Sequence, residues 1–335
     1  MTSTGDERTS LPPWELVARA SQMQRVARLA TAQELHEVLH DDRTRLRFLE
    51  RLRWPHGFAC ARCGGRHQPS RPRPGVLVCA RCNWFATVTA DTFLRDARVP
   101  LARWFALYWA IATGELLPTT GGLRSFLKLP DPAPQALSAA AVLAAAESEP
   151  LEGNVDFDGR AVEVSGRMEL LFVAAEHRDD GTGRVRMRRT ATLDKRAVRG
   201  FIESAVAIGS TVHTDCWSNH LGLDELPIVQ RVHLGLEPPA PGTALPRLDR
   251  ISSLLRRWLS HHRVIRREDV GVALDGFCLA FNRSRHRSAG AVFCHLMRAM
   301  FVLARAQRRK RRKVSGVTRV ATGAQESTDD DRASA

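Results

Sequence analysis

The chain has 335 residues, and 50 lysines and arginines against 36 aspartates and glutamates give it a formal net charge of +14 at pH 7. With 44% hydrophobic and 26% charged residues it can bury a core, which excludes a wholly disordered protein. The length suits two or three domains. So basic a chain favours a polyanionic partner, with nucleic acid first and an anionic membrane surface second.

The sequence gives little support to a membrane protein. No stretch approaches the roughly 18–20 uninterrupted apolar residues that a spanning helix needs, and the best candidate is the short run 137–146. The polar N-terminus, MTSTGDERTSLPP, does not resemble a signal peptide. We therefore expect a cytoplasmic, nucleoid-associated protein without a membrane partner. Disulfides are rare in such a compartment, so the seven cysteines need another explanation.

The first half of the chain predicts three segments. Residues 1–54 form a helical lead-in, with one helix over about 31–54. Residues 55–98 are rich in Gly, Pro, Arg and Cys, which is typical of a small turn-rich module. Residues 99–150 are predicted to be helical, with helices over 101–113 and about 135–148 and a break at Gly121-Gly122.

The second half predicts an α/β domain over residues 151–285. Alternating and continuous apolar runs indicate a three-stranded meander over 155–164, 170–175 and 185–192. A helix over 195–207, a parallel strand at 211–214, a strand at 228–233 and helices over 247–260 and 267–282 follow. Residues 286–335 are expected to hold a helix over 289–306, the basic run 305–313 and a disordered tail.

Four cysteines predict a zinc site. Cys60 and Cys63 form one C-x-x-C knuckle, Cys79 and Cys82 form another, and 15 residues separate the two. Each knuckle directs two thiolates at one ion, and two knuckles complete a tetrahedral sulfur shell. Four thiolates leave no open position, so the zinc is expected to be structural. The other three cysteines, Cys216, Cys278 and Cys294, lack such spacing and are interpreted as core residues.

Basic residues around the cysteines favour nucleic acid as the partner of this module. They are Arg51, Arg53, Arg62, Arg66, Arg71, Arg73 and Arg81. In the following helical segment, a Gly-containing turn between short helices is compatible with a helix-turn-helix, in which Arg124 and Lys128 would face phosphates. A plain helical linker explains the same pattern equally well.

Three carboxylates in the second half could hold metal. Asp156 and Asp158 lie two apart on a strand and so share a face. Asp215 follows the strand at 211–214, at a sheet edge where ligands bind in open α/β sheets. Asp249 lies near the start of the helix over 247–260, with Arg256 seven residues on and hence on the same face. Carboxylates from strand, strand and helix could bind two Mg²⁺ or Mn²⁺ ions, whereas scattered surface acids are the alternative.

Several motifs together resemble a known family. They are Trp54-Pro-His-Gly-Phe58, the two knuckles, Phe85-Ala-Thr-Val-Thr-Ala-Asp-Thr-Phe93, Val99-Pro-Leu-Ala-Arg-Trp-Phe105, Leu151-Glu-Gly153 through Asp158, Val212-His-Thr-Asp-Cys-Trp-Ser218, Leu255-Arg-Arg-Trp-Leu259 and Phe281-Asn-Arg283. Over residues 45–285 the sequence resembles a bacterial insertion-sequence transposase of the fifteen-ninety-five family, with a zinc ribbon and an ISXO-two-like DDE domain.

The resemblance implies a ribonuclease-H-like catalytic domain that cuts element ends and joins them to target DNA. By position in the motifs, Asp158 and Asp215 would be the first and second catalytic aspartates, which hold magnesium, and Asp249 the third acid. Arg256 and Arg257 would contact phosphates. The zinc ribbon and helical segment would recognise terminal inverted repeats, and a homo-oligomer would assemble on DNA.

The sequence also departs from the family. Gly159 replaces the glutamate usual after the first aspartate, Leu254 replaces an asparagine of one branch, and Arg256 replaces a lysine. Gly276 takes the place of a late acid, although Asp275 adjoins it. Three alternatives therefore stay open: a transposase relic that only binds DNA, a metal-dependent nuclease without strand transfer, and a zinc-ribbon transcription or ribosome-associated factor.

Overall fold

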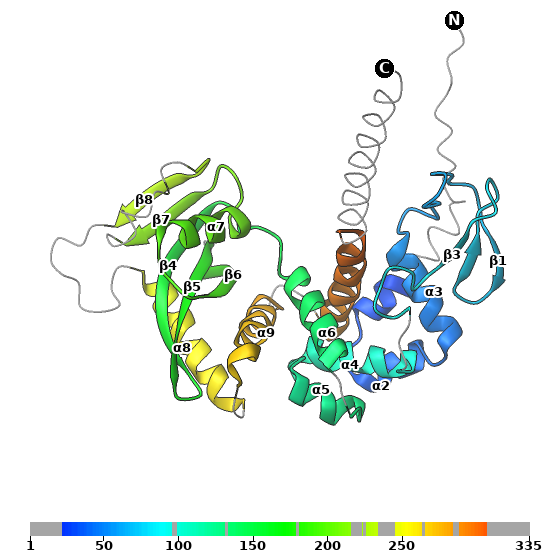
Figure 1. Cartoon of the computed structure of the whole chain (residues 1–335), viewed down its shortest axis with the longest axis horizontal. Helices are drawn as coiled ribbons and strands as arrows, with labels where there is room; N and C mark the ends of the chain where they lie inside the picture. The colour runs from blue at the N-terminus through cyan, green and yellow to red at the C-terminus, as the bar shows by residue number, and fades with distance from the viewer. Residues whose placement is uncertain are drawn as a thin grey trace, which may run out of the picture. The chain divides into compact units, whose positions relative to one another are not determined.

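The structure is a computed structural model that describes residues 22–95, 99–130, 133–178, 181–215, 223, 226–233, 245–262, 265–283 and 288–306 (Figure 1). It is a mixed α/β protein, as the sequence predicts, and it divides into two compact units. Unit 1 comprises Met1–Met23, Leu39–Ala102 and Met297–Ala335, and unit 2 comprises Gln24–Val38 and Arg103–Leu296. The five-segment division drawn from the sequence stays a prediction.

The helix predicted over 31–54 is two helices, α2 (Ala32–Val38) and α3 (Asp42–Arg53). The break lies at Asp41, whose side chain accepts a hydrogen bond from the backbone N–H of Thr44 at 2.7 Å. An aspartate at this N-cap position satisfies an N–H that has no partner inside the helix, so it starts a new helix. Periodicity alone missed this boundary.

Unit 1 combines α3 with a small antiparallel sheet. Its strands β1 (Ser70–Arg73), β2 (Val76–Val78) and β3 (Phe85–Thr87) lie in the order β1-β2-β3. Phe48 and Leu49 of α3 and Leu77 of β2 are fully buried. The helix and the sheet therefore both contribute buried apolar side chains to the interior of unit 1.

Unit 2 contains α2 and then α4 (Leu101–Thr113), α5 (Thr120–Leu127) and α6 (Ala133–Ala146), although the first two residues of α4 belong to unit 1. Helix α4 has the predicted bounds. The sequence predicts a break in helical structure at Gly121 and Gly122, but both residues lie in the first turn of α5. Thr119 is the reason, because its side chain accepts from the N–H of Gly122 at 3.1 Å and caps the helix.

A five-stranded mixed sheet is the centre of unit 2, with strand order β6-β5-β4-β7-β8. Strands β4 (Asn154–Val164), β5 (Arg167–Arg178) and β6 (Gly181–Thr190) form the predicted antiparallel meander. Strand β7 (Thr211–Asp215) runs parallel to β4, and β8 (Val229–His233) runs parallel to β7. The predicted parallel strand is confirmed.

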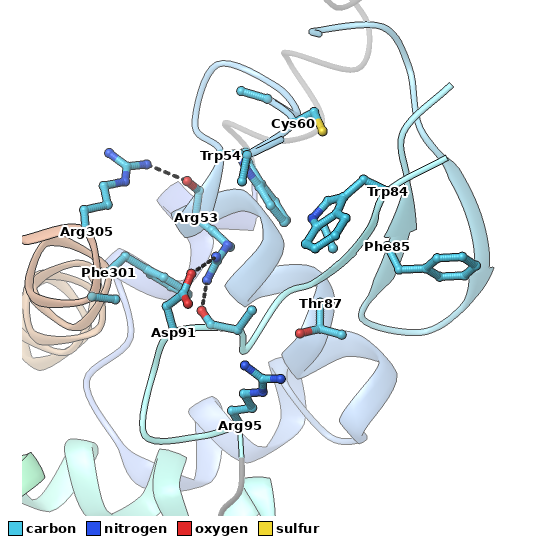
Figure 2. Close-up of a pocket in the computed structure, with 15 residues that line it drawn as sticks. Arg53, Trp54, Cys60, Trp84, Phe85, Thr87, Asp91, Arg95, Phe301 and Arg305 are labelled. Carbon is cyan, nitrogen blue, oxygen red and sulfur yellow. Dashed lines mark hydrogen bonds and ion pairs between the residues drawn. The ribbon is translucent and has the colours of Figure 1, made fainter. Parts of the chain in front are cut away.

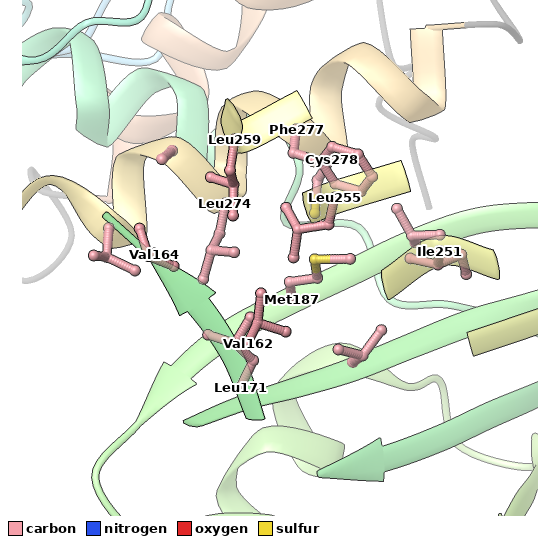
Figure 3. Close-up of a cluster of buried hydrophobic side chains, with 14 of the residues drawn as sticks. Val162, Val164, Leu171, Met187, Ile251, Leu255, Leu259, Leu274, Phe277 and Cys278 are labelled. Carbon is pink, nitrogen blue, oxygen red and sulfur yellow. The ribbon is translucent and has the colours of Figure 1, made fainter. Parts of the chain in front are cut away.

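Helices cover both faces of this sheet. Helix α7 (Lys195–Ala205) packs on one face, where the rings of Phe157, Phe172 and Phe201 lie 5.3 to 5.8 Å apart. Helix α8 (Pro246–His261) and α9 (Val270–Asn282), which follows a short 3-10 turn at Arg267–Asp269, pack on the other face. Figure 3 shows Val162 and Leu171 of the strands beneath Leu255 and Phe277 of these helices. Alternation along β4 therefore sends Asp156, like Val162, toward α8.

The last described helix, Ala289–Ala306, is a better candidate for a membrane span than the run 137–146, which the sequence alone favours. Its 18 residues have a mean hydropathy of 1.4, so by length and composition it is apolar enough to cross a membrane. Of these residues, 56% are buried inside the protein. A buried core helix passes the same test, so the helix is weak support for a membrane span.

Candidate functional site

The four predicted zinc ligands lie together. The Sγ atoms of Cys60 and Cys82 are 3.7 Å apart, as are those of Cys63 and Cys79, and all four lie within 4.8 Å of one another. Four thiolates at 2.3 Å from a tetrahedral zinc would be separated by about 3.8 Å. The cysteine cluster therefore fits a structural Zn²⁺. Cys278 and Cys294 are buried core residues as predicted, and Cys216 lies outside the described residues.

The thiols of this cluster affect one another's ionisation. Burial raises the pKa of Cys79, but the backbone N–H groups of Arg81 and Cys82, with the thiols of Cys63 and Cys60, outweigh it and lower that pKa to about 7. Burial raises the pKa of the Cys82 thiol to about 12. Four thiolates so close together repel one another, so full ionisation of the cluster requires a bound cation.

Two of the three predicted catalytic acids are joined by an arginine. The Nε of Arg160 lies 2.6 Å from Oδ2 of Asp158, and its Nη1 donates to Oδ1 of Asp249 at 2.7 Å. Asp158 is on the central strand β4, and Asp249 is in the first turn of α8. The fold thus brings carboxylates from distant parts of the sequence to one guanidinium. Arg160 was not among the site residues predicted from the sequence.

The chemistry of this cluster partly fits a divalent cation. Carboxylate oxygens are ligands that Mg²⁺ and Mn²⁺ prefer. Oδ2 of Asp249 is buried and has no hydrogen-bond partner among the described residues, so it is an available ligand. Arg160 competes, because its positive charge lies against both carboxylates. Among the described side chains, only the four cysteines bring three or more His, Cys, Asp or Glu ligand atoms within 4.8 Å of one another.

Asp215 ends strand β7, where its backbone pairs with His233 of β8. Its side chain lies outside the described part of the structure. In the parallel pair of β4 and β7, Asp156 lies opposite His213. Asp158 and Asp215 are each two residues further along their strands, so their backbones stand at the same level of the sheet. The contacts of Asp215 with the other acids stay a prediction.

A second polar cluster surrounds Asp156, which is buried like Asp158. One carboxylate oxygen contacts Nε2 of His177, and the other lies 3.6 Å from Nη1 of Arg247 on α8. His177 stacks on His213 with 4.8 Å between ring centroids. Sequence reasoning missed these partners, because the two histidines meet only through strand pairing.

Helix α9 carries a glycine, Gly276, at the place of the family's late acid. A Cβ at Gly276, where the family has its late acid, would lie 2.4 Å from a methyl of Leu117 and 3.5 Å from the ring of Trp258. That position therefore faces apolar side chains. The neighbouring Asp275 has its pKa raised to about 7 by burial, with Arg186 and Glu147 as its charged neighbours.

The four predicted phosphate-binding residues are exposed. Arg256 and Arg257 lie on α8, where Nη2 of Arg256 donates to Oγ of Ser253 at 3.2 Å. Seven residues along a helix correspond to about 10 Å, so Arg256 lies two turns from Asp249 rather than beside it. Arg124 is on the exposed face of α5, and Lys128 caps its C-terminus.

Residues 40–84 match the transposase zinc-ribbon domain. This match covers the cysteine quartet, α3 and the first two strands of unit 1. It supports a transposase-related role and agrees with the resemblance drawn from the sequence motifs over that region. The rest of the chain lies outside the matched residues.

No curated protein matches the chain. Among solved structures, the chain is similar to a chain in the cryo-EM structure of a simian T-cell lymphotropic virus intasome in complex with the PP2A regulatory subunit B56 gamma. That similarity has 15% identity and a TM-score of 0.27, and it covers 37% of this chain and 48% of the other, which is less than half of its length.

Proposed function

We propose that the chain is a DNA transposase of the insertion-sequence type, which cuts the ends of its element and joins them to target DNA. The observation that carries the proposal is the meeting of Asp158 and Asp249 at Arg160, in a chain whose zinc ribbon matches that of transposases. The strand order β6-β5-β4-β7-β8, with two parallel pairs after an antiparallel meander, supports a ribonuclease-H-like catalytic domain.

In this proposal, Asp158, Asp215 and Asp249 hold the catalytic cations, and Arg256 and Arg257 bind DNA phosphates. Bound Mg²⁺ or Mn²⁺ would activate the attacking oxygen and stabilise the leaving oxygen of the phosphodiester. Asp158 is held in place by the backbone N–H of Gly159, which donates to its Oδ1 at 2.7 Å, and by Arg160. A fixed carboxylate on the central strand can orient a ligand with little rearrangement.

Recognition of DNA is assigned to several exposed basic surfaces. The zinc ribbon and α5, with Arg124 and Lys128, would bind the terminal inverted repeats. The basic run 305–313, of which only Arg305 and Ala306 are described, would add affinity that falls as salt rises. A homo-oligomer on paired DNA ends and a location at the nucleoid in the cytoplasm complete the proposal.

One observation favours a second function, a DNA-binding protein without catalysis. Arg160 already supplies the positive charge that Asp158 and Asp249 require. The guanidinium balances one of the two carboxylate charges and contacts both groups, so it holds the pair together without a metal ion. If Arg160 keeps both contacts in solution, the chain binds DNA through its basic surfaces and cuts nothing.

Strand transfer with the element's inverted repeat separates these functions. Purified protein is incubated with labelled repeat DNA, plasmid target and Mg²⁺ or Mn²⁺, beside Asp158→Asn, Asp215→Asn and the control Glu163→Gln. Glu163 is an exposed acid on the same strand. We expect joined products from the wild type and the control, and none from either aspartate variant.

The other outcomes are distinct. Cleavage that depends on Asp158 without joining would indicate a nuclease. Salt-sensitive binding without cleavage would establish the DNA-binding function and contradict the transposase.

A further inference from the structure

Unit 1 contains a pocket that the proposed chemistry does not use. Its volume is about 540 Å³, which is within the usual range of ligand pockets. The end of α3, the cysteine module and the last turns of the helix Ala289–Ala306 form its walls. Figure 2 shows Trp54 and Trp84 on the side of the module, and Phe301 and Arg305 on the side of the helix.

The pocket presents aromatic rings to solvent. Trp84 is 45% exposed and Phe85 is 66% exposed, although each is large and apolar. The guanidinium of Arg62 lies 5.7 Å from the ring centroid of Trp84. Trp54 makes an edge contact with Phe58 at 5.3 Å, which fixes its ring from one side. Exposed rings beside arginine are the platforms on which proteins stack unpaired bases.

The charges around the pocket favour an anionic ligand. Among the described residues that line the pocket, the one acid is Asp91, which pairs with Arg53 at 3.5 Å, and Arg53 also donates to the carbonyl of Val88 at 3.2 Å. These contacts neutralise Asp91. Arg95 and Arg305 are exposed at the margin, with Arg305 donating to the backbone carbonyl of Arg53 at 2.7 Å. The described residues that line the pocket therefore carry a net positive charge.

We propose that this pocket binds an unpaired nucleotide of a single DNA strand. The base would stack on Trp84, and Arg62 and Arg95 would lie near its phosphates. A base inside a duplex has both faces covered by its neighbours, so only an unpaired base can offer a face to the ring. Such a pocket would serve the proposed function, because DNA that is cut at an element's end exposes unpaired nucleotides. The inference rests on the proposed function only for the origin of the single-stranded DNA.

Binding of short oligonucleotides to the full zinc-loaded chain tests the proposal. Fluorescence anisotropy is measured with a labelled twelve-nucleotide thymidine strand, the same strand made abasic, and a duplex of equal length. Loss of one base-stacking platform is worth about 1–3 kcal/mol, so Trp84→Ala should weaken binding of the base-containing strand about 5- to 150-fold. Binding of the duplex should weaken less than binding of the single strand, and Trp84→Phe should restore most of the affinity.

Met168→Ala is the control, because Met168 is 65% exposed and lies on β5 in unit 2. Zinc content and circular dichroism show that each variant is folded. Equal affinity of Trp84→Ala and Met168→Ala for the base-containing strand would overturn the proposal, as would equal affinity of the wild type for the abasic strand.

Two further results distinguish single-strand binding by the pocket from binding of free nucleotides and from the proposed transposase activity. Free thymidine monophosphate should compete only weakly with the strand. Competition as strong as that of the strand would identify a free-nucleotide site and overturn the DNA assignment. A Trp84-dependent preference for single strands, in a protein that joins no DNA, would support the pocket while contradicting the transposase.

Discussion

Arg160 and Asp249 form an ion pair between the central strand β4 and the first turn of α8, with Nη1 and Oδ1 2.7 Å apart. The same guanidinium contacts Asp158 through Nε at 2.6 Å. The Asp158 side chain is only 7% exposed, so solvent screens this contact weakly. Arg160 therefore both stabilises the two carboxylates and competes with any cation that they bind.

Replacing Arg160 by glutamine should lower the stability of the metal-free protein and raise its affinity for divalent cations. Loss of the charged hydrogen bond to Asp249 and of the ion pair with Asp158 is expected to lower the free energy of unfolding by about 1–3 kcal/mol. Removal of a positive charge beside the carboxylates should raise their affinity for Mn²⁺ about tenfold or more. Urea unfolding gives the first quantity, and calorimetric titration with Mn²⁺ gives the second.

Arg256→Gln is the matched control, because Arg256 is exposed and its side chain contacts Ser253 of its own helix. It should change neither quantity. If Arg160→Gln left Mn²⁺ affinity unchanged, Arg160 would not compete with a cation at this place.

Removal of zinc should unfold the cysteine module and spare unit 2. Cys82→Ala leaves only three thiolates to bind the ion. Because binding of structural zinc supplies much of the folding free energy of small modules, the module should unfold when the zinc is lost. Unit 2 retains its own sheet and core. We expect zinc content to fall from one ion per chain to none, and limited proteolysis to cut within residues 55–95 while a fragment containing the sheet survives. Cys294→Ala, outside the cluster, should keep the zinc.

Asp275 should make unit 2 less stable as the pH rises. Burial raises its pKa from 3.8 to about 7, so the folded protein holds a proton that the unfolded chain has lost in this range. The free energy of unfolding therefore falls between about pH 4 and pH 7 through this group. Asp275→Asn lacks this loss, so its stability relative to wild type should grow across that range and level off above pH 7. Urea unfolding at several pH values measures the difference, and a difference that is constant with pH would contradict the assignment.

Two helical glycines of unit 2 should respond oppositely to alanine. A Cβ at Gly290 would lie 2.0 Å from the carbonyl oxygen of Val26, so the backbone must move. Gly290→Ala is expected to lower the free energy of unfolding by about 1–3 kcal/mol. Gly271, in α9, has open space around its Cβ position, and Gly271→Ala should raise stability by about 0.5–1 kcal/mol. Equal effects would show that backbone packing at Gly290 is looser than the structure indicates.

The sequence predicted most helices and strands because their apolar residues recur at helix or strand spacing. The zinc ligands could also be predicted from the sequence, because a four-cysteine zinc site requires two closely spaced cysteine pairs. Arg160 was within reach too, because it lies two residues after Asp158 and so shares its face of β4. The contacts of His177 with Asp156 and His213 could not be found, because they depend on the register of β4, β5 and β7, which one sequence does not determine.

In the proposed transposase, strand transfer depends on the binding of a divalent cation at Asp158. Electron paramagnetic resonance counts Mn²⁺ bound to the zinc-loaded protein without DNA, for the wild type, Asp158→Asn and Glu163→Gln. The proposed transposase predicts bound Mn²⁺ in the wild type and in Glu163→Gln, and its loss in Asp158→Asn. No bound Mn²⁺ in the wild type, or equal binding in all three proteins, would contradict a catalytic metal site at Asp158.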